Sequence, residues 1–88
     1  MFRMWGKIIR SGRIERDFTA CDDRMVNRTK KVFGCLEQIC REFDLDMPQW
    51  MNGNIAEFGA MGKTRFSPNS FMDSVDFDFL EIQVVEED

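Results

Sequence analysis

The chain has 88 residues, of which 43% are hydrophobic, and a formal net charge of −4. This length supports one small domain with one core, and the hydrophobic share excludes a disordered chain. No stretch approaches the roughly 20 consecutive apolar residues of a membrane helix, so we expect no membrane span.

Residues 2–21 predict a β-hairpin. The segments FRMWGKIIR and RIERDFTAC flank the turn-prone dipeptide Ser11-Gly12, and apolar residues recur in them with a period near two. One face of the hairpin is expected to carry Met4, Ile8, Ile14, Phe18 and Ala20. The other face is expected to carry Trp5, Lys7, Ile9, Glu15, Asp17 and Thr19.

Residues 24–43 predict an amphipathic helix, because apolar side chains recur there at steps of three and four. The apolar stripe comprises Met25, Thr29, Val32, Phe33, Leu36, Ile39, Cys40 and Phe43. One of the two aspartates before this segment, Asp22 or Asp23, is expected to cap the first turn. Gly34 lies inside the helix and indicates a close neighbour at that position.

Residues 45–74 are less regular but rich in large side chains. Asn54 with Glu57 three positions later predicts the start of a short helix across IAEFGAM. Ser67-Pro68 predicts one further helical turn. Four aromatic anchors indicate that the segment packs on the rest of the chain: Trp50, Phe58, Phe66 and Phe71.

The final segment, FDFLEIQVVEED, predicts a core strand whose interspersed acids oppose pairing with other chains. Leu80, Ile82 and Val84 share one face of this strand. The other face carries Phe77, Phe79, Glu81, Gln83 and Val85. We therefore expect a single α+β domain over residues 1–88, with a three-stranded, mainly antiparallel sheet and the long helix on one face.

The sequence contains little that would support catalysis or metal binding. It has no His and no Tyr, and its three cysteines, Cys21, Cys35 and Cys40, do not have the spacing of a zinc site. Gly62-Lys63-Thr64 matches the end of a phosphate-binding loop, but Glu57 replaces the first glycine of that motif, so we expect an ordinary loop. We expect no catalytic residue, no cofactor and no metal, and a small enzyme or metal-binding protein is the alternative we favour least.

The charges are divided unevenly between the two halves. Residues 1–43 contain ten Lys/Arg against six Asp/Glu, a sum of +4, and residues 44–88 contain two against ten, a sum of −8. The halves could neutralise each other within one fold or between two copies. A candidate basic patch at the start of the predicted helix comprises Arg24, Arg28, Lys30 and Lys31. Together with the hairpin it makes a nucleic-acid-binding module the stronger alternative, although the acidic pI of about 4.8 opposes it.

One helix can cover only one face of the predicted sheet. The opposite face then exposes a candidate interface of Trp5, Ile9, Phe79 and Val85. Either residues 45–74 cover this face or a partner does. We expect a non-enzymatic domain that associates with another protein or with itself as a homodimer. With an odd number of cysteines and no signal peptide expected, we place it in the cytoplasm.

Five stretches carry a resemblance to a known group of proteins: MWGKII, RTKKVF, LEQICREFDLDMPQW, KTRFSPNSF and FDFLEIQVVEED. Through them the chain resembles a family of short bacterial proteins of unassigned function. The resemblance implies one compact domain and brings no activity, cofactor or site residue.

Overall fold

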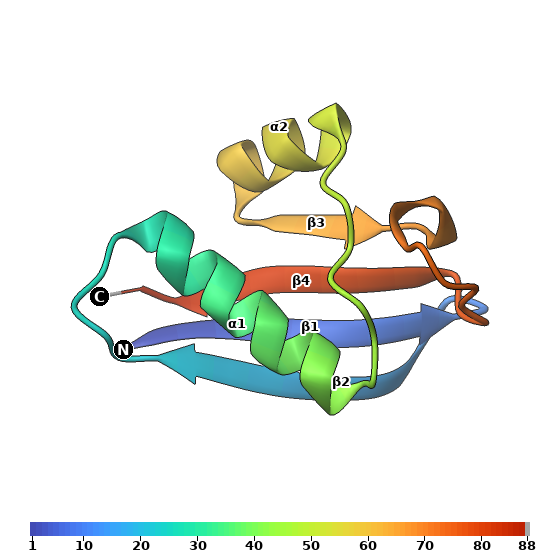
Figure 1. Cartoon of the computed structure of the whole chain (residues 1–88), viewed down its shortest axis with the longest axis horizontal. Helices are drawn as coiled ribbons and strands as arrows, with labels where there is room; N and C mark the ends of the chain where they lie inside the picture. Colours follow the sequence, from blue (N-terminus) through green and yellow to red (C-terminus); the bar gives the residue numbers. More distant parts are fainter. Residues whose placement is uncertain (88) are drawn as a thin grey trace.

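The computed structural model describes residues 1–87, which form a four-stranded antiparallel sheet and two helices (Figure 1). In chain order the elements are β1 (Phe2–Arg10), β2 (Arg13–Asp22), α1 (Arg28–Glu42), α2 (Asn52–Met61), β3 (Lys63–Phe66), a 3-10 turn (Pro68–Ser70) and β4 (Phe79–Glu86). The strand order is β2-β1-β4-β3, so the first and last strands of the chain are central neighbours. The α+β class is confirmed, whereas the expected number of three strands is wrong.

The additional strand is β3, within a segment for which the sequence predicts an ordinary loop. Gly62 ends α2 in the left-handed region, with φ of 68°, and turns the chain back along β4. Thr64 and Phe66 point into the core, while Lys63 and Arg65 are exposed. Four residues are too few for this alternation to stand out in the sequence.

The hairpin forms as expected, with both turn residues, Ser11 and Gly12, at positive φ. The β1–β2 register shifts between Ile8 and Ile9, so Ile9 pairs with Ile14. The bulge therefore places Ile14 on the same face as Ile9. The expectation that Ile14 shares a face with Phe18 is wrong, because one extra residue inverts the alternation.

The helix α1 begins four residues later than the sequence predicts. Asn27 caps it, and its Oδ1 accepts a hydrogen bond from the backbone N–H of Lys30 at 2.9 Å. The expected aspartate cap is wrong because Asp22 still belongs to β2. Its carboxylate instead accepts from the Arg24 guanidinium at 2.6 Å.

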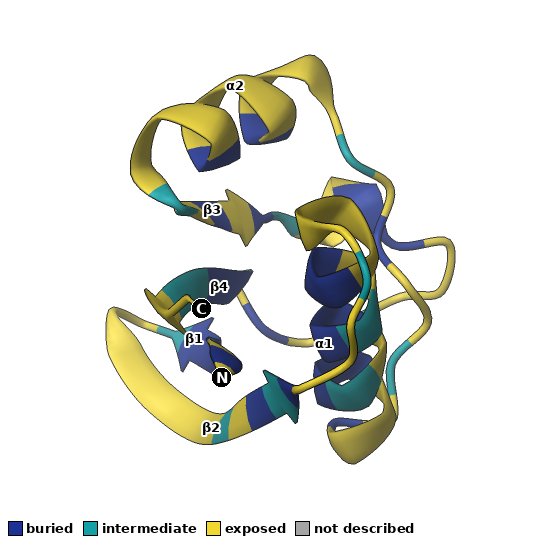
Figure 2. Ribbon diagram, turned by 90° about the vertical axis from the view of Figure 1, so that its left-hand side faces the viewer, coloured by how far each residue is buried: buried dark blue, intermediate teal, exposed yellow. Residues whose placement is uncertain are grey.

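Two glycines allow close approach around α1. A Cβ on Gly6, in the middle of β1, would lie 2.5 Å from Cγ2 of Ile39. A Cβ on Gly34 would lie 2.7 Å from the Arg24 guanidinium, so the close neighbour expected at Gly34 is present. The helix α1 thus lies directly on the centre of the sheet, and the hydrophobic core lies between α1 and the sheet (Figure 2).

The segment between α1 and β3 packs on the same side of the sheet as α1, next to β3. The Trp50 ring packs against Phe33, Phe58 and Phe66, with ring centroids 5.9, 5.4 and 5.1 Å apart. Phe66 pairs with the fully buried Leu80 of β4, so these rings belong to the core beneath the helices. Residues 45–74 therefore do not cover the opposite face of the sheet (Figure 2).

Asn54 connects α2 to β3. It lies at the third position of α2, where its Oδ1 accepts from the backbone N–H of Met51, and its Nδ2 donates to Oγ1 of Thr64 and to the carbonyl of Arg65. The expected start of this helix at Asn54 is therefore wrong. The buried amide holds both the helix end and the edge strand.

Candidate functional site

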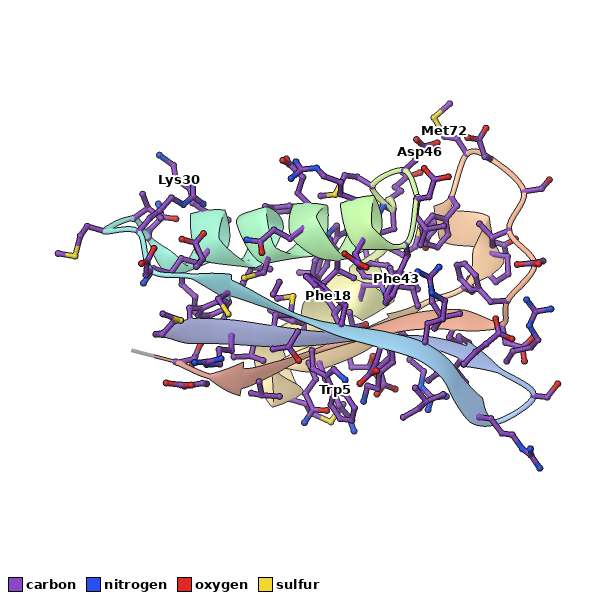
Figure 3. The ribbon with its side chains drawn as sticks, turned by 90° about the horizontal axis from the view of Figure 1, so that it is seen from below. Trp5, Phe18, Lys30, Phe43, Asp46 and Met72 are labelled. Carbon is purple, nitrogen blue, oxygen red and sulfur yellow. The ribbon has the colours of Figure 1, made fainter. Side chains whose placement is uncertain are left out.

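The side of the sheet opposite α1, here called the helix-free face, is the candidate site. Figure 3 shows Trp5 on this side, whereas Phe18 and Phe43 lie between the sheet and α1. Strand pairing arranges its side chains in rows across the strands, and three consecutive rows make up the candidate site. The charged row contains Asp17, Lys7, Glu81 and Arg65; the tryptophan row contains Thr19, Trp5, Gln83 and Lys63; the apolar row contains Ile14, Ile9 and Phe79.

The charged row contains a buried ion pair. Nζ of Lys7 lies 2.5 Å from Oε2 of Glu81, and Nε of Arg65 lies 2.6 Å from Oε1 of the same carboxylate. The side chains of Lys7 and Glu81 are each only 8% exposed. No helix of the described residues covers this face, so the neighbouring side chains shield the pair from water.

Trp5 and Arg65 provide much of that shield. The indole N–H of Trp5 donates to Oδ2 of Asp17 at 2.8 Å, and Nζ of Lys7 lies 3.9 Å from the centre of the indole ring. The Arg65 guanidinium lies 5.0 Å from the centre of the Phe79 ring. The hydrogen bond and the two cation–π contacts hold the Trp5 indole and the Arg65 guanidinium beside the ion pair. The result is a preorganised surface that links all four strands.

The electrostatics of the pair follow from its two cations. Burial alone would raise the pKa of Glu81, but hydrogen bonds and charge from Lys7 and Arg65 outweigh burial and hold that pKa below its ordinary value. Glu81 is therefore ionised at neutral pH. It acts as a fixed anion between two strands, not as a proton donor.

The structure brings together three of the four residues of the candidate interface. Trp5, Ile9 and Phe79 lie on the helix-free face, with the charged row between Trp5 and the other two. Val85 lies where the β1–β4 register shifts, and it lines a separate hollow with Arg28 and the end of α2. The bulge at this position, which the sequence does not reveal, removes Val85 from the alternation.

Sequence reasoning missed the Lys7–Glu81 pair at the centre of the face. Each residue occupies an alternating strand position between apolar or aromatic neighbours, which is the available signal. Opposite charges directly across two strands attract each other. The pairing would have followed from the sequence only if the β1–β4 register had been known.

The candidate basic patch is largely engaged within the fold. Arg24 binds Asp22, and Arg28 lies 2.5 Å from Glu87 at the acidic end of the chain. Lys31 is buried, at 8% exposure, whereas Lys30 is exposed. The charge asymmetry between the halves is thus partly neutralised intramolecularly, which weakens the patch as a phosphate-binding footprint.

Two of the three cysteines are buried, and two aspartates before β4 are engaged with the hairpin turn and its neighbour Arg10. Burial raises the pKa of Cys35 to about 11 and that of Cys40 to about 12, so both remain thiols at neutral pH. Asp76 binds Arg10, and Asp78 accepts from the backbone N–H of Ser11. Among residues 1–87, no three His, Cys, Asp or Glu side chains are grouped as metal ligands.

A second apolar surface lies between α1 and α2. It is a groove of about 290 Å³ whose lining includes Phe33, Trp50, Ile55 and Phe58. Nε1 of Trp50 is buried there and has no hydrogen-bond acceptor within the described chain. The groove has no charged group in its lining, so it lacks the polar features that would specify a ligand.

Neither helix of residues 1–87 has the length and apolar character needed to cross a bilayer. The resemblance to short bacterial proteins stays a prediction. Comparison with protein-family models, with curated proteins and with solved structures finds no significant match to this chain.

Proposed function

We propose that the protein is a non-enzymatic interaction domain that associates through the helix-free face. The observation that carries this proposal is the buried Lys7–Glu81 pair on a sheet face without a covering layer. A partner on this face would find Trp5 already fixed by Asp17, so little side-chain entropy is lost on binding. Trp and Arg are also the side chains that most often dominate the energy of protein interfaces.

The composition of the face supports a protein partner. Trp5 and the apolar row flank a charged row whose central pair is buried, and partly exposed Trp and apolar side chains of this kind are enriched at protein interfaces. A nucleic acid would instead require an excess of cations, whereas the two cations of the charged row, Lys7 and Arg65, are matched there by two anions, Asp17 and Glu81. The three free cysteines fit the reducing cytoplasm as the compartment in which this association occurs.

The chain offers a matched pair of positions for the test. Ile14 is 52% exposed on the helix-free face, and Ile55 is 58% exposed on α2. Each would be replaced in turn by the photo-crosslinking residue benzoylphenylalanine, and the cells that produce the protein would be irradiated. The proposal expects a covalent adduct from position 14 and none from position 55. No adduct from position 14, or equal yields from both positions, would overturn it.

A further inference from the structure

We propose that the partner on the helix-free face is a second copy of this chain, packed face to face about a two-fold axis parallel to the strands. The axis would pass between β1 and β4, the two central strands. This inference rests on the proposed function and adds the identity and orientation of the partner. Its basis is the order of charges across the sheet.

The charged row alternates in sign from one edge of the sheet to the other. It runs Asp17 on β2, Lys7 on β1, Glu81 on β4 and Arg65 on β3, which is minus, plus, minus, plus. The row is therefore antisymmetric about the boundary between β1 and β4. A two-fold axis at that boundary reverses the strand order of the second copy, and every charge in the row meets its opposite.

The edges show the consequence most directly. Asp17 of one copy would lie opposite Arg65 of the other, and the symmetry makes this contact twice. A two-fold axis perpendicular to the strands and level with the charged row would instead place β2 over β2, so that Asp17 met Asp17 and Arg65 met Arg65. Like charges brought together in this way oppose association. The sequence of charges thus selects one of the two face-to-face arrangements.

The other rows agree with the same axis. Rotation about an axis along the strands leaves each row at its own height, so the apolar row meets itself. Ile9 on β1 of one copy would lie opposite Phe79 on β4 of the other, and Ile14 on β2 would lie beside that pair. Such a sandwich keeps the strands of the two sheets nearly aligned, within about 30°, as in aligned sheet packing.

The size of the face predicts a weak dimer. Four strands spaced about 4.8 Å apart, with a longest strand of about 30 Å, present roughly 500 Å² per copy. The total of about 1,000 Å² lies at the lower limit for specific interfaces. We therefore expect reversible association that depends on concentration, and salt should weaken it because the edge charges are exposed.

Site-directed cross-linking tests the orientation. In a Cys21→Ser background, Thr19→Cys and Lys63→Cys would be prepared as separate proteins; both positions are exposed in the tryptophan row, at opposite edges of the sheet. Opposed sheets lie about 10 Å apart, within reach of a short bismaleimide. A mixture of the two proteins should form a covalent dimer, whereas either protein alone should form almost none.

The outcomes separate this inference from the proposed function. A dimer from Thr19→Cys alone would place β2 over β2 and overturn the axis. No cross-link in any combination, with a photo-adduct to another protein from position 14, would overturn self-association and leave the proposed function standing. No photo-adduct at all would overturn both.

A charge variant provides a second, independent readout. Asp17→Lys reverses two symmetric contacts with Arg65 of the second copy and should weaken dimerisation about thirtyfold, which corresponds to roughly 1 kcal/mol per reversed contact. Glu37→Lys makes the same change in net charge on α1, where the Glu37 side chain is 63% exposed, and should leave dimerisation unchanged. Equal effects of the two substitutions would show that only net charge matters and would contradict the proposed contact.

Discussion

Removal of one member of the Lys7–Glu81 pair should destabilise the fold much more than loss of an exposed ion pair. Breaking a buried pair from one side typically costs about 3–5 kcal/mol, because a charge remains buried without its partner. After Lys7→Met, Glu81 keeps Arg65, so we expect a loss near 3 kcal/mol, the lower end of that range. After Glu81→Met, Lys7 keeps only the Gln83 oxygen at 3.5 Å and the Trp5 ring, so we expect a loss of about 4–5 kcal/mol.

The double variant separates the pair from its setting. With Lys7→Met and Glu81→Met together, no buried charge is left between β1 and β4, and Arg65 can turn to solvent because its side chain is 52% exposed. We expect the double variant to be more stable than either single variant, since apolar replacement of a whole buried pair is often close to neutral.

Urea unfolding near neutral pH, followed by circular dichroism, gives the free energy of unfolding of each variant. Arg41→Met is the control, because its i,i+4 pair with Glu37 is 71% and 63% exposed and should contribute almost nothing. Losses below about 1 kcal/mol for both single variants would show that the Lys7–Glu81 pair is solvated like a surface pair. Such losses would contradict a buried ion pair on the helix-free face.

Three further predictions concern stability and reactivity. The folded state lowers the pKa of Glu81, so the ionised Glu81 stabilises the fold at a pH above the ordinary glutamate pKa, and this stabilisation is lost as the pH falls through the folded-state pKa. Glu81→Gln should therefore make the free energy of unfolding depend less on pH on the acid side. Parallel pH dependences of the wild type and the variant would contradict this. Gly6→Ala should lower the free energy of unfolding by about 1–3 kcal/mol, because the new Cβ would lie 2.5 Å from Ile39. Gly53→Ala, which has open space around it in α2, should raise that free energy by about 0.5–1 kcal/mol. Calorimetry that ranks the two variants in the opposite order would contradict this packing. Iodoacetamide should modify Cys21 first in the folded protein, and Cys35 and Cys40 only after urea unfolding. Three equally fast modifications in mass spectrometry would refute the burial of Cys35 and Cys40.

The sequence predicts the elements whose periodicity is long enough to read. The hairpin turn at Ser11-Gly12, the amphipathic pattern of α1 and the inward face of β4 at Leu80 and Ile82 all follow from local rules. β3 could not be predicted because a four-residue edge strand contains only two inward positions. It forms because β4 provides the pairing partner, and its paired residues lie 14 to 20 positions later in the chain, outside any local pattern.

The site was only partly predictable for the same reason. Alternation along single strands brings Trp5, Ile9 and Phe79 to one face. The two register shifts bring Ile14 to that face and remove Val85 from the alternation, and a bulge is not visible in the pattern of a single strand. The alternating charges across four strands emerge only when the strand order is known.

The most direct test of self-association through the helix-free face is the solution mass by sedimentation equilibrium over a range of protein concentrations at low salt. The wild-type mass should rise from the chain mass of 10.4 kDa towards twice that value. Ile14→Lys, on the helix-free face, should keep the mass at that of the monomer, and Ile55→Lys, on α2, should behave as the wild type. A wild-type protein that remains monomeric at every concentration, or a dimer that Ile55→Lys disrupts and Ile14→Lys does not, would contradict the account.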